Sequence, residues 1–257
     1  MPKRKPFVVV GIDLAGSPRR PTGICLLRGL RAQTLIAFSD EDILNALHEA
    51  RPDLVPIDAP LCLPQGRRTI HDRAGQHFRE CDLELRRRGI RFFPITLGPM
   101  RMLTERGLAL KAKIRAMGYH AIECYPGAAQ DLWGIPRQHQ NRKALLAGLR
   151  KLGVRGLAKA ITSDELDAVT AALVGRWLLL GWGEMLGGEE GIAIPVRKDV
   201  RHPPKDTAKV VLPAPLSLRN IINMTHVGQA DAAKPKTEKQ SHEEKTVKSP
   251  RVSSAKS

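Results

Sequence analysis

Short apolar runs, separated by polar and turn-forming segments, divide the first 200 residues of the chain into strands and helices. The segment 7–14 contains the run VVVGID, whose nearly continuous apolar character is typical of a strand buried on both faces. Two alternating segments on either side of Gly29 predict a β-hairpin. In chain order, the predicted strands cover residues 7–14, 22–29, 31–39, 53–58, 119–123 and 191–196.

Apolar residues at helical spacing predict helices between and after these strands. The first begins at Ser39 as its N-cap and has acidic residues in its first turn, and another is closed by Gly89. The predicted helices cover residues 39–50, 69–89, 98–118, 142–152 and 162–181. Three early strands followed by alternating helices and strands predict an α/β fold, in which a mixed sheet carries an antiparallel hairpin at one edge and helices on both faces.

The composition changes near residue 200. Beyond it the chain is punctuated by proline and then becomes rich in Lys and Ser, with few large apolar groups. Such a segment cannot bury enough apolar surface to offset its ordering entropy. We therefore expect one folded domain over residues 1–200 and a basic, disordered tail over 201–257, which is either a solubilising extension or a binding arm.

The chain carries a net charge of +16, spread over both of these parts. This charge favours an anionic partner, with nucleic acid first, although a solvated basic surface gives the same total. The apolar stretches are too short to span a bilayer, and the N-terminus lacks the features of a secretory signal. The four cysteines, Cys25, Cys62, Cys81 and Cys124, include no Cys-x-x-Cys pair. We expect reduced thiols in a cytoplasmic protein without a membrane partner.

Three of the predicted strands end in a carboxylate, at Asp13, Asp58 and Glu123. Ligands of α/β sheets bind beyond the carboxyl ends of the strands, and carboxylates gathered there repel one another unless a cation neutralises them. Any one of these acids could instead cap its own turn. Three such endings together favour a site for Mg²⁺ or Mn²⁺, both of which prefer oxygen ligands.

The predicted helix 162–181 contributes two more acids. Asp164 and Asp167 are three residues apart and therefore share a face, which small residues continue. A helix with such a face can lie close to a sheet and project its carboxylates towards the strand ends. Asp164 could alternatively complement the helix dipole, whereas Asp167 lies past the first turn.

The motifs GIDLAGS, IDAPL, RECDLELRRRG, IECYP and SDELDAVTAAL resemble, in this order, the family of domains of unknown function DUF429. The resemblance covers residues 7–196 and implies a ribonuclease H-like fold and a nuclease activity. It places Asp13, Asp58 and Glu123 at strand-end acidic positions. It places Asp164 or Asp167 at the position of the helical acid in Holliday-junction-resolvase-like proteins.

A nuclease of this kind would hydrolyse phosphodiester bonds with two Mg²⁺ or Mn²⁺ ions about 3.5–4 Å apart. One ion would activate a water molecule, and the other would stabilise the leaving oxygen. The candidate ligands are Asp13, Asp58, Glu123, Asp164 and Asp167. All of these except Asp164 are also predicted to be catalytic, with Asp13 bridging the ions because it ends the strand expected at the centre of the sheet.

Three arginines of the predicted charged helix are candidates for contacts to the phosphates of DNA or RNA. Arg79, Asp82 and Arg86 share one face, so that Arg79 could pair with Asp82 and leave Arg86 for a phosphate, with Arg87 beside it. A solvated face with ordinary ion pairs is the alternative. Tyr125, close to Glu123 in the sequence, could line the site.

Two other functions are compatible with the sequence. An actin- or hexokinase-like phosphotransferase would need glycine-rich phosphate loops, for which GIDLAGS offers one weak candidate. A nucleic-acid-binding module could bind metal through the same acids without turnover, and its basic charge would serve it equally well.

Overall fold

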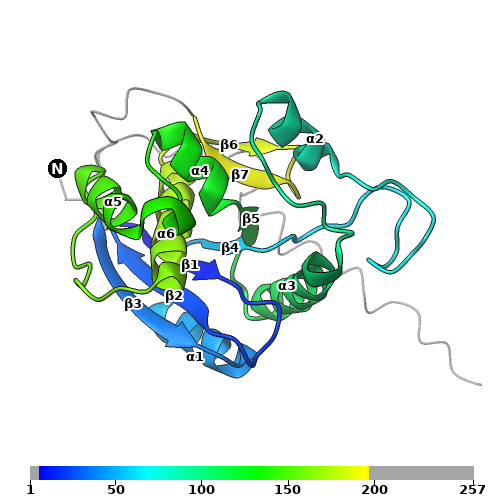
Figure 1. The fold of residues 1–257 in the computed structure, drawn as a ribbon. Helices are drawn as coiled ribbons and strands as arrows, with labels where there is room; N and C mark the ends of the chain where they lie inside the picture. The colour runs from blue at the N-terminus through cyan, green and yellow to red at the C-terminus, as the bar shows by residue number, and fades with distance from the viewer. Residues whose placement is uncertain (1–5, 197–257) are drawn as a thin grey trace, which may run out of the picture. The chain divides into compact units, whose positions relative to one another are not determined.

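A single mixed sheet organises residues 6–196, which are the residues that the computed structural model describes. Its strand order is β3-β2-β1-β4-β5-β7-β6 (Figure 1). The strands are β1 (Val8–Asp13), β2 (Thr22–Arg28), β3 (Arg31–Ala37), β4 (Val55–Asp58), β5 (Ala121–Cys124), β6 (Gly183–Leu186) and β7 (Ile192–Pro195). The predicted domain boundary at residue 200 and the predicted tail 201–257 lie outside the described residues.

The first three strands form an antiparallel meander at one edge of the sheet. Its second turn is made by Gly29, whose φ of 57° is a conformation that glycine adopts without strain. Strands β1, β4, β5 and β7 are then mutually parallel, and β6 returns antiparallel to β7. Three antiparallel strands followed by parallel ones confirm the mixed sheet with an antiparallel hairpin at one edge that the sequence predicts.

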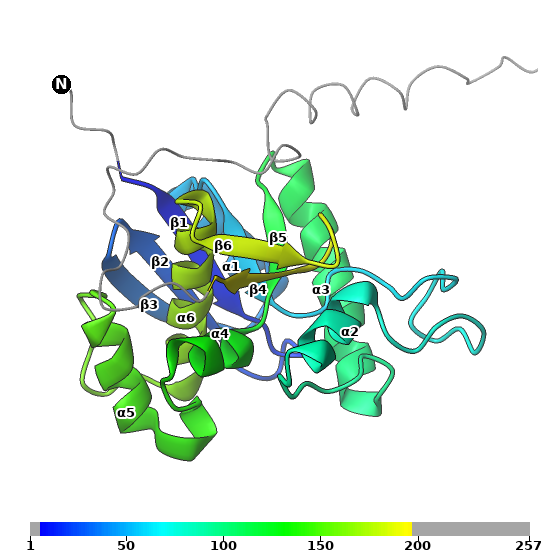
Figure 2. The same ribbon diagram turned by 90° about the horizontal axis from the view of Figure 1, so that it is seen from above.

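Helices cover both faces of the sheet, as predicted (Figure 2). They are α1 (Asp40–Ala50), α2 (Glu80–Arg87), α3 (Gly98–Ala116), α4 (Pro126–Trp133), α5 (Gln138–Lys151) and α6 (Ser163–Leu179). The apolar residues of α4, α5 and α6 form one core with one face of the sheet, and those of α1 and α3 form a second core with the other face. Strands buried on both faces explain the unbroken apolar run of β1.

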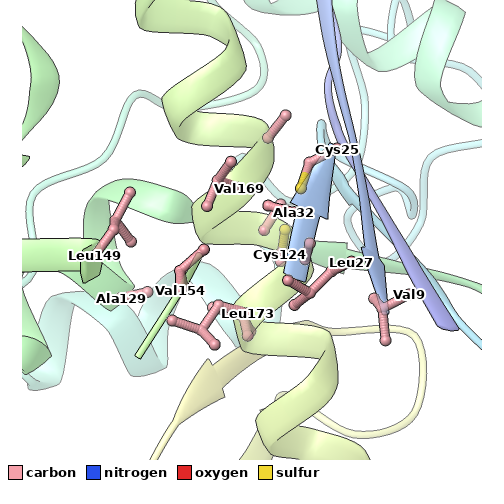
Figure 3. Close-up of a cluster of buried hydrophobic side chains, with 14 of the residues drawn as sticks. Val9, Cys25, Leu27, Ala32, Cys124, Ala129, Leu149, Val154, Val169 and Leu173 are labelled. Carbon is pink, nitrogen blue, oxygen red and sulfur yellow. The ribbon is translucent and has the colours of Figure 1, made fainter. Parts of the chain in front are cut away.

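The larger core is centred on α6, nearly all of which is buried. Val169 and Leu173 of this helix face Cys25 and Leu27 of β2 and lie near Val9 of β1 (Figure 3). Burying a side chain of this size contributes about 1.5–3 kcal/mol. The larger core therefore holds α6 in place on the sheet and, with it, the carboxylates at the N-terminal end of this helix.

Glycines in the strands let α6 lie directly on the sheet. A Cβ atom added at Gly11 would come within 2.2 Å of the Ala168 carbonyl oxygen, and one at Gly23 within 2.1 Å of the Asp164 carbonyl oxygen. On the helix side, a Cβ atom at Gly175 would meet Pro56 at 2.7 Å. The close approach expected from the small face of this helix is thus made by small residues on both elements.

Some predicted elements differ from those observed. The segment 69–79 is not helical, because the Asp72 carboxylate accepts bonds from the backbone of Arg68 and Thr69 and closes a local turn that competes with a helix. Helix α4 and strand β6 were not predicted. Both are short, and β6 follows a glycine-containing turn directly after α6.

None of the helices within residues 6–196 combines the length and the apolar character that crossing a membrane requires.

Candidate functional site

Two carboxylates stand side by side at the ends of neighbouring parallel strands. Asp13 of β1 and Asp58 of β4 are direct partners in the β1–β4 register. Residues paired in this way point to the same side of the sheet, about 5 Å apart. Both are only partly exposed. The strand ends therefore bring together two negative charges that are 45 residues apart in sequence.

Helix α6 adds Asp167 to this pair. Gln130 of α4 donates from Nε2 to Asp167 Oδ1 at 2.7 Å and also reaches Thr170 Oγ1 at 3.2 Å, so it fixes one carboxylate oxygen of Asp167. Asp164, one turn earlier, is also partly exposed, and its charge acts on Asp13. Helix α6 therefore brings Asp167 and Asp164 within electrostatic range of the carboxylate at the end of β1.

The electrostatics show how close these acids are. Burial raises the pKa of Asp13 well above its usual range, and the charges of Asp167 and Asp164 raise it further, whereas Arg20 opposes the increase. Burial also raises the pKa of Asp58, with contributions from Asp13, Asp167 and Glu123. Burial raises the pKa of Asp167 to about 6, even though the Gln130 hydrogen bond lowers it.

Asp13 and Asp58 lack hydrogen-bonding and ion-pairing partners for their carboxylates among residues 6–196. Ionising both groups there costs free energy, because burial removes part of their hydration and no bonded partner compensates for the loss. We call Asp13, Asp58 and Asp167 the acidic cluster. Its chemistry is that of hard oxygen donors with an excess of negative charge.

Glu123 is in a different situation. Arg79 donates from Nη1 to Glu123 Oε2 at 2.6 Å and from Nη2 to Oε1 at 2.9 Å, and the Leu61 amide donates to Oε2 at 2.7 Å. Burial raises the pKa of Glu123, and Arg79 lowers it. Both carboxylate oxygens are therefore already bound, although Glu123 was predicted with the other strand-end acids.

Arg79 is correspondingly occupied. Its Nε and Nη2 atoms also donate to Asp82 at 3.1 and 2.8 Å, and Nη1 contacts Cys62 Sγ at 3.6 Å. These bonds use all the donors of the guanidinium, which is 5% exposed. The pairing with Asp82 agrees with the prediction, but no donor of Arg79 is left for a phosphate.

The other two predicted phosphate contacts lie on the exposed side of α2. The Arg86 guanidinium is 5.0 Å from the centre of the Phe78 ring, and Arg87 pairs with Glu80 and Glu84 at the surface. Surface pairs of this kind are weak, so either arginine could exchange its partner for a phosphate at small cost.

Further basic groups surround the acidic cluster, and sequence reasoning missed them. The charge of Arg20 acts on Asp13 and Asp164, and those of His139 and Arg137 act on Asp167. Arg20 follows β1 in the run SPRRP, whose position next to a strand-end acid was a usable signal. Arg137 and His139 lie at the start of α5, and no periodicity connects them with the strand ends.

Tyr125, predicted to line the site, is held by Arg137. The arginine donates from Nη1 to the Tyr125 hydroxyl at 2.8 Å and lies 5.4 Å from the ring centre, and the hydroxyl donates to the Arg91 carbonyl at 2.8 Å. Burial raises the pKa of Tyr125, and the charge of Asp58 adds to that effect. The tyrosine therefore lies within electrostatic range of the acidic cluster.

A formed metal centre is not present in the part of the chain that the structure describes. There, no three His, Cys, Asp or Glu side chains make a group that could hold a metal ion as they stand. The acidic cluster has the donor atoms and the charge of a divalent-cation site, but its side chains do not converge on one point.

The meander at one edge, the parallel strands beside it and the carboxylates at the ends of β1 and β4 define an α/β protein with a mixed sheet. A family comparison gives the particular family. The chain belongs to DUF429, described as "Protein of unknown function", whose model matches residues 11–190. This match confirms the family that the sequence motifs predict.

Two solved structures of RuvC from Thermus thermophilus are similar to the chain. One, described as RuvC in complex with Holliday junction substrate, is 15% identical, with 66% of this chain and 94% of that chain covered and a TM-score of 0.39. The other is also 15% identical and covers 68% and 96% of the two chains, with a TM-score of 0.40. No curated protein matches the chain.

Proposed function

We propose that this protein is a divalent-metal-dependent nuclease that hydrolyses phosphodiester bonds, with Asp13, Asp58 and Asp167 as its metal ligands. The observation that carries the proposal is the acidic cluster itself. Carboxylates from β1, β4 and α6 are held within electrostatic range of one another, and each has a pKa raised by burial. A structural role would have supplied a cationic partner, as Arg79 does for Glu123.

Mg²⁺ or Mn²⁺ bound by these oxygens would activate a water molecule and stabilise the negative charge that develops at phosphorus. The chain's own contribution is to hold the ligands. Asp13 and Asp58 are set by strand register, and Asp167 is oriented by Gln130. Because one Asp167 oxygen is already bound, the other is the one available to a cation. Asp164 is more exposed to solvent and completes the set as an outer ligand.

We leave Glu123 and Arg79 out of the reacting groups, since their mutual bonds already use both carboxylate oxygens and the guanidinium donors. In their place, Arg20 is proposed to contact the phosphates that flank the cleaved bond, because its charge already acts on Asp13 and Asp164. Arg86 and Arg87 remain proposed contacts for a more distant part of the nucleic acid, in keeping with the basic charge of the chain.

The test is a cleavage assay of the full chain with Mg²⁺ or Mn²⁺ on single-stranded, duplex and branched DNA and RNA. The substitutions Asp13→Asn and Asp167→Asn should each lower the cleavage rate by a factor of about 100 or more, since each removes a charged ligand. The matched control is Glu165→Gln, two residues from Asp167 on the same helix, whose carboxylate caps α6 and binds Thr34. That variant should retain cleavage.

Other results would favour the other functions. Protection of the chain by ATP against thermal unfolding, without cleavage, would indicate a phosphotransferase. Salt-dependent binding of nucleic acid with no cleavage in any metal would indicate a binding module. A wild-type protein that cuts nothing in the panel overturns the nuclease proposal.

A further inference from the structure

A cavity of about 220 Å³ lies between the loop that follows β4, the start of α2 and the turn between β6 and β7. Its walls include Cys62, Cys81, Arg79, Gln76 and Glu190. A water molecule needs about 15 Å³ of comparable space, so the cavity can admit a small polar molecule as well as solvent. The cavity is not part of the acidic cluster.

Two thiols meet at this cavity. Cys62 is partly exposed in the loop, whereas Cys81 in the first turn of α2 is only 2% exposed. Both side chains line the same cavity, and Arg79 Nη1 lies 3.6 Å from Cys62 Sγ. A buried cation beside a thiol that solvent can reach is the environment in which a thiolate forms and reacts.

We propose that Cys62 and Cys81 form an oxidation site for hydrogen peroxide, in which Cys62 is the reacting thiolate and Cys81 closes an intramolecular disulfide. The proposal does not depend on the nuclease function. It rests on the arrangement of an accessible thiol, a neighbouring buried thiol, a fixed guanidinium and a cavity with polar walls.

The chemistry balances in two steps. The Cys62 thiolate attacks one peroxide oxygen, the O–O bond breaks, and the departing hydroxide takes up a proton to become water, which leaves Cys62 as a sulfenic acid. The Cys81 thiol then loses its proton and attacks Cys62 Sγ, the S–O bond breaks, and hydroxide leaves with that proton as a second water. Two thiols are oxidised, one peroxide is reduced, and an external thiol reverses the reaction.

The two thiols are suited to different parts. The hydrogen bond from Cys81, and then the charge of Arg79, lower the pKa of Cys62 despite its partial burial. The same hydrogen bond and burial raise the pKa of Cys81. Cys62 is therefore the thiol that ionises more readily and that peroxide reaches first, and Cys81 is the thiol that keeps its proton until a sulfenic acid forms beside it.

The remaining cysteines supply an internal control. Cys25 is 0% exposed and Cys124 is 1% exposed, and both belong to the core between the sheet and α6 (Figure 3). Burial raises the pKa of both thiols. Neither should react with peroxide while the protein is folded.

The experiment treats the reduced, folded full-length chain with hydrogen peroxide, alkylates the remaining thiols and maps the peptides by mass spectrometry. A Cys62–Cys81 disulfide should form and disappear on addition of a thiol reductant. Cys62 should be oxidised about tenfold or more faster than Cys25 or Cys124. In Cys81→Ser, a sulfenic acid at Cys62 should be trapped by dimedone, and Cys62→Ser should trap none.

Wild-type mapping decides the proposal even if a variant folds poorly. Conversion of Cys62 to sulfinic acid with no link to Cys81 would show that the second thiol does not close the disulfide, and the proposal would fail. Equal oxidation of all four cysteines would show that the reaction follows unfolding, and this result would also refute the proposed oxidation site.

Discussion

Asp167→Asn should stabilise the metal-free protein at neutral and alkaline pH. Burial raises the pKa of Asp167 to about 6, against about 3.9 in an unfolded chain. Below about pH 4 the group is protonated in both states and costs nothing. As the pH rises through this interval the unfolded chain loses its proton first, so the folded state becomes less stable until Asp167 is ionised in both states. Asparagine removes that cost and can still accept the Gln130 bond.

The size of the effect follows from the two pKa values. Each pKa unit corresponds to about 1.4 kcal/mol, which gives about 3 kcal/mol for the full difference. Because Asp167 is partly exposed, screening by solvent reduces this to about 1–2 kcal/mol. For a domain of this size, each kcal/mol corresponds to about 2–4 °C in Tm. The variant should therefore melt about 2–8 °C above the wild type.

The assay is thermal unfolding of both proteins in a chelator, at about pH 8 and again near pH 4. The gain should be complete at the higher pH and largely lost at the lower one. Glu165→Gln is the matched control, and it should change the thermal stability in the opposite direction. Burial of Glu165 is outweighed by hydrogen bonds from Thr34 and Thr162, which lower its pKa, so the loss of its charge should destabilise the protein near pH 8. If Asp167→Asn melts lower than the wild type at about pH 8, or if its gain is unchanged near pH 4, the reasoning is refuted.

The remaining predictions concern metal binding, the arginine clamp and the helix–sheet contact. Mn²⁺ in excess should raise the Tm of the wild type at about pH 8, by an amount equivalent to about 2.7 kcal/mol at a hundred times its Kd, and Asp13→Asn should abolish this gain in a thermal scan. Arg79→Lys should lower the free energy of unfolding by about 3–5 kcal/mol in urea titrations, because it breaks buried paired bonds, whereas exposed Arg87→Lys should change it by less than about 1 kcal/mol. Gly11→Ala should cost about 3 kcal/mol or more by overpacking, whereas Gly98→Ala, with open space around it, should be neutral or slightly stabilising in the same titration.

The class of fold could be predicted because its elements carry local signals. β1 is apolar throughout, the hairpin is marked by Gly29, and α6 begins with a capping box. The segment 69–79 could not be assigned correctly, since its charges fit a helix face while Asp72 closes a competing turn that depends on local bonds. Helix α4 was missed because its eight residues include proline and glycine and gain their stability from packing on α6.

For the site, the sequence identified the acids but could not identify their partners. Asp58 and Glu123 both lie near a strand end in the sequence, but Glu123 pairs with Ile57 in the β4–β5 register and precedes the last residue of β5, so the two acids point to opposite faces of the sheet. On its own face of the sheet, Glu123 is bound on both carboxylate oxygens by Arg79, which is 44 residues away in the sequence. Spacing along the helix predicted the pairing of Arg79 with Asp82, but no periodicity predicts a contact so distant in sequence.

The close packing of α6 on the sheet also determines how near the carboxylates of the acidic cluster lie to one another. Gly11 and Gly23 weaken their strands, because glycine loses more backbone entropy on folding than other residues and offers no side chain for packing. In return, the backbone of α6 lies directly on β1 and β2, and Asp167 is carried to the level of Asp13 and Asp58. Burial, and then the charges of the neighbouring acids, raise the pKa values of these groups and cost stability, and the large apolar core beneath α6 offsets this cost. Among residues 6–196, Glu123 has an arginine bound to both of its carboxylate oxygens, whereas Asp13 and Asp58 have no such ion pair, and this contrast is the reason we propose that a cation from solution completes the acidic cluster.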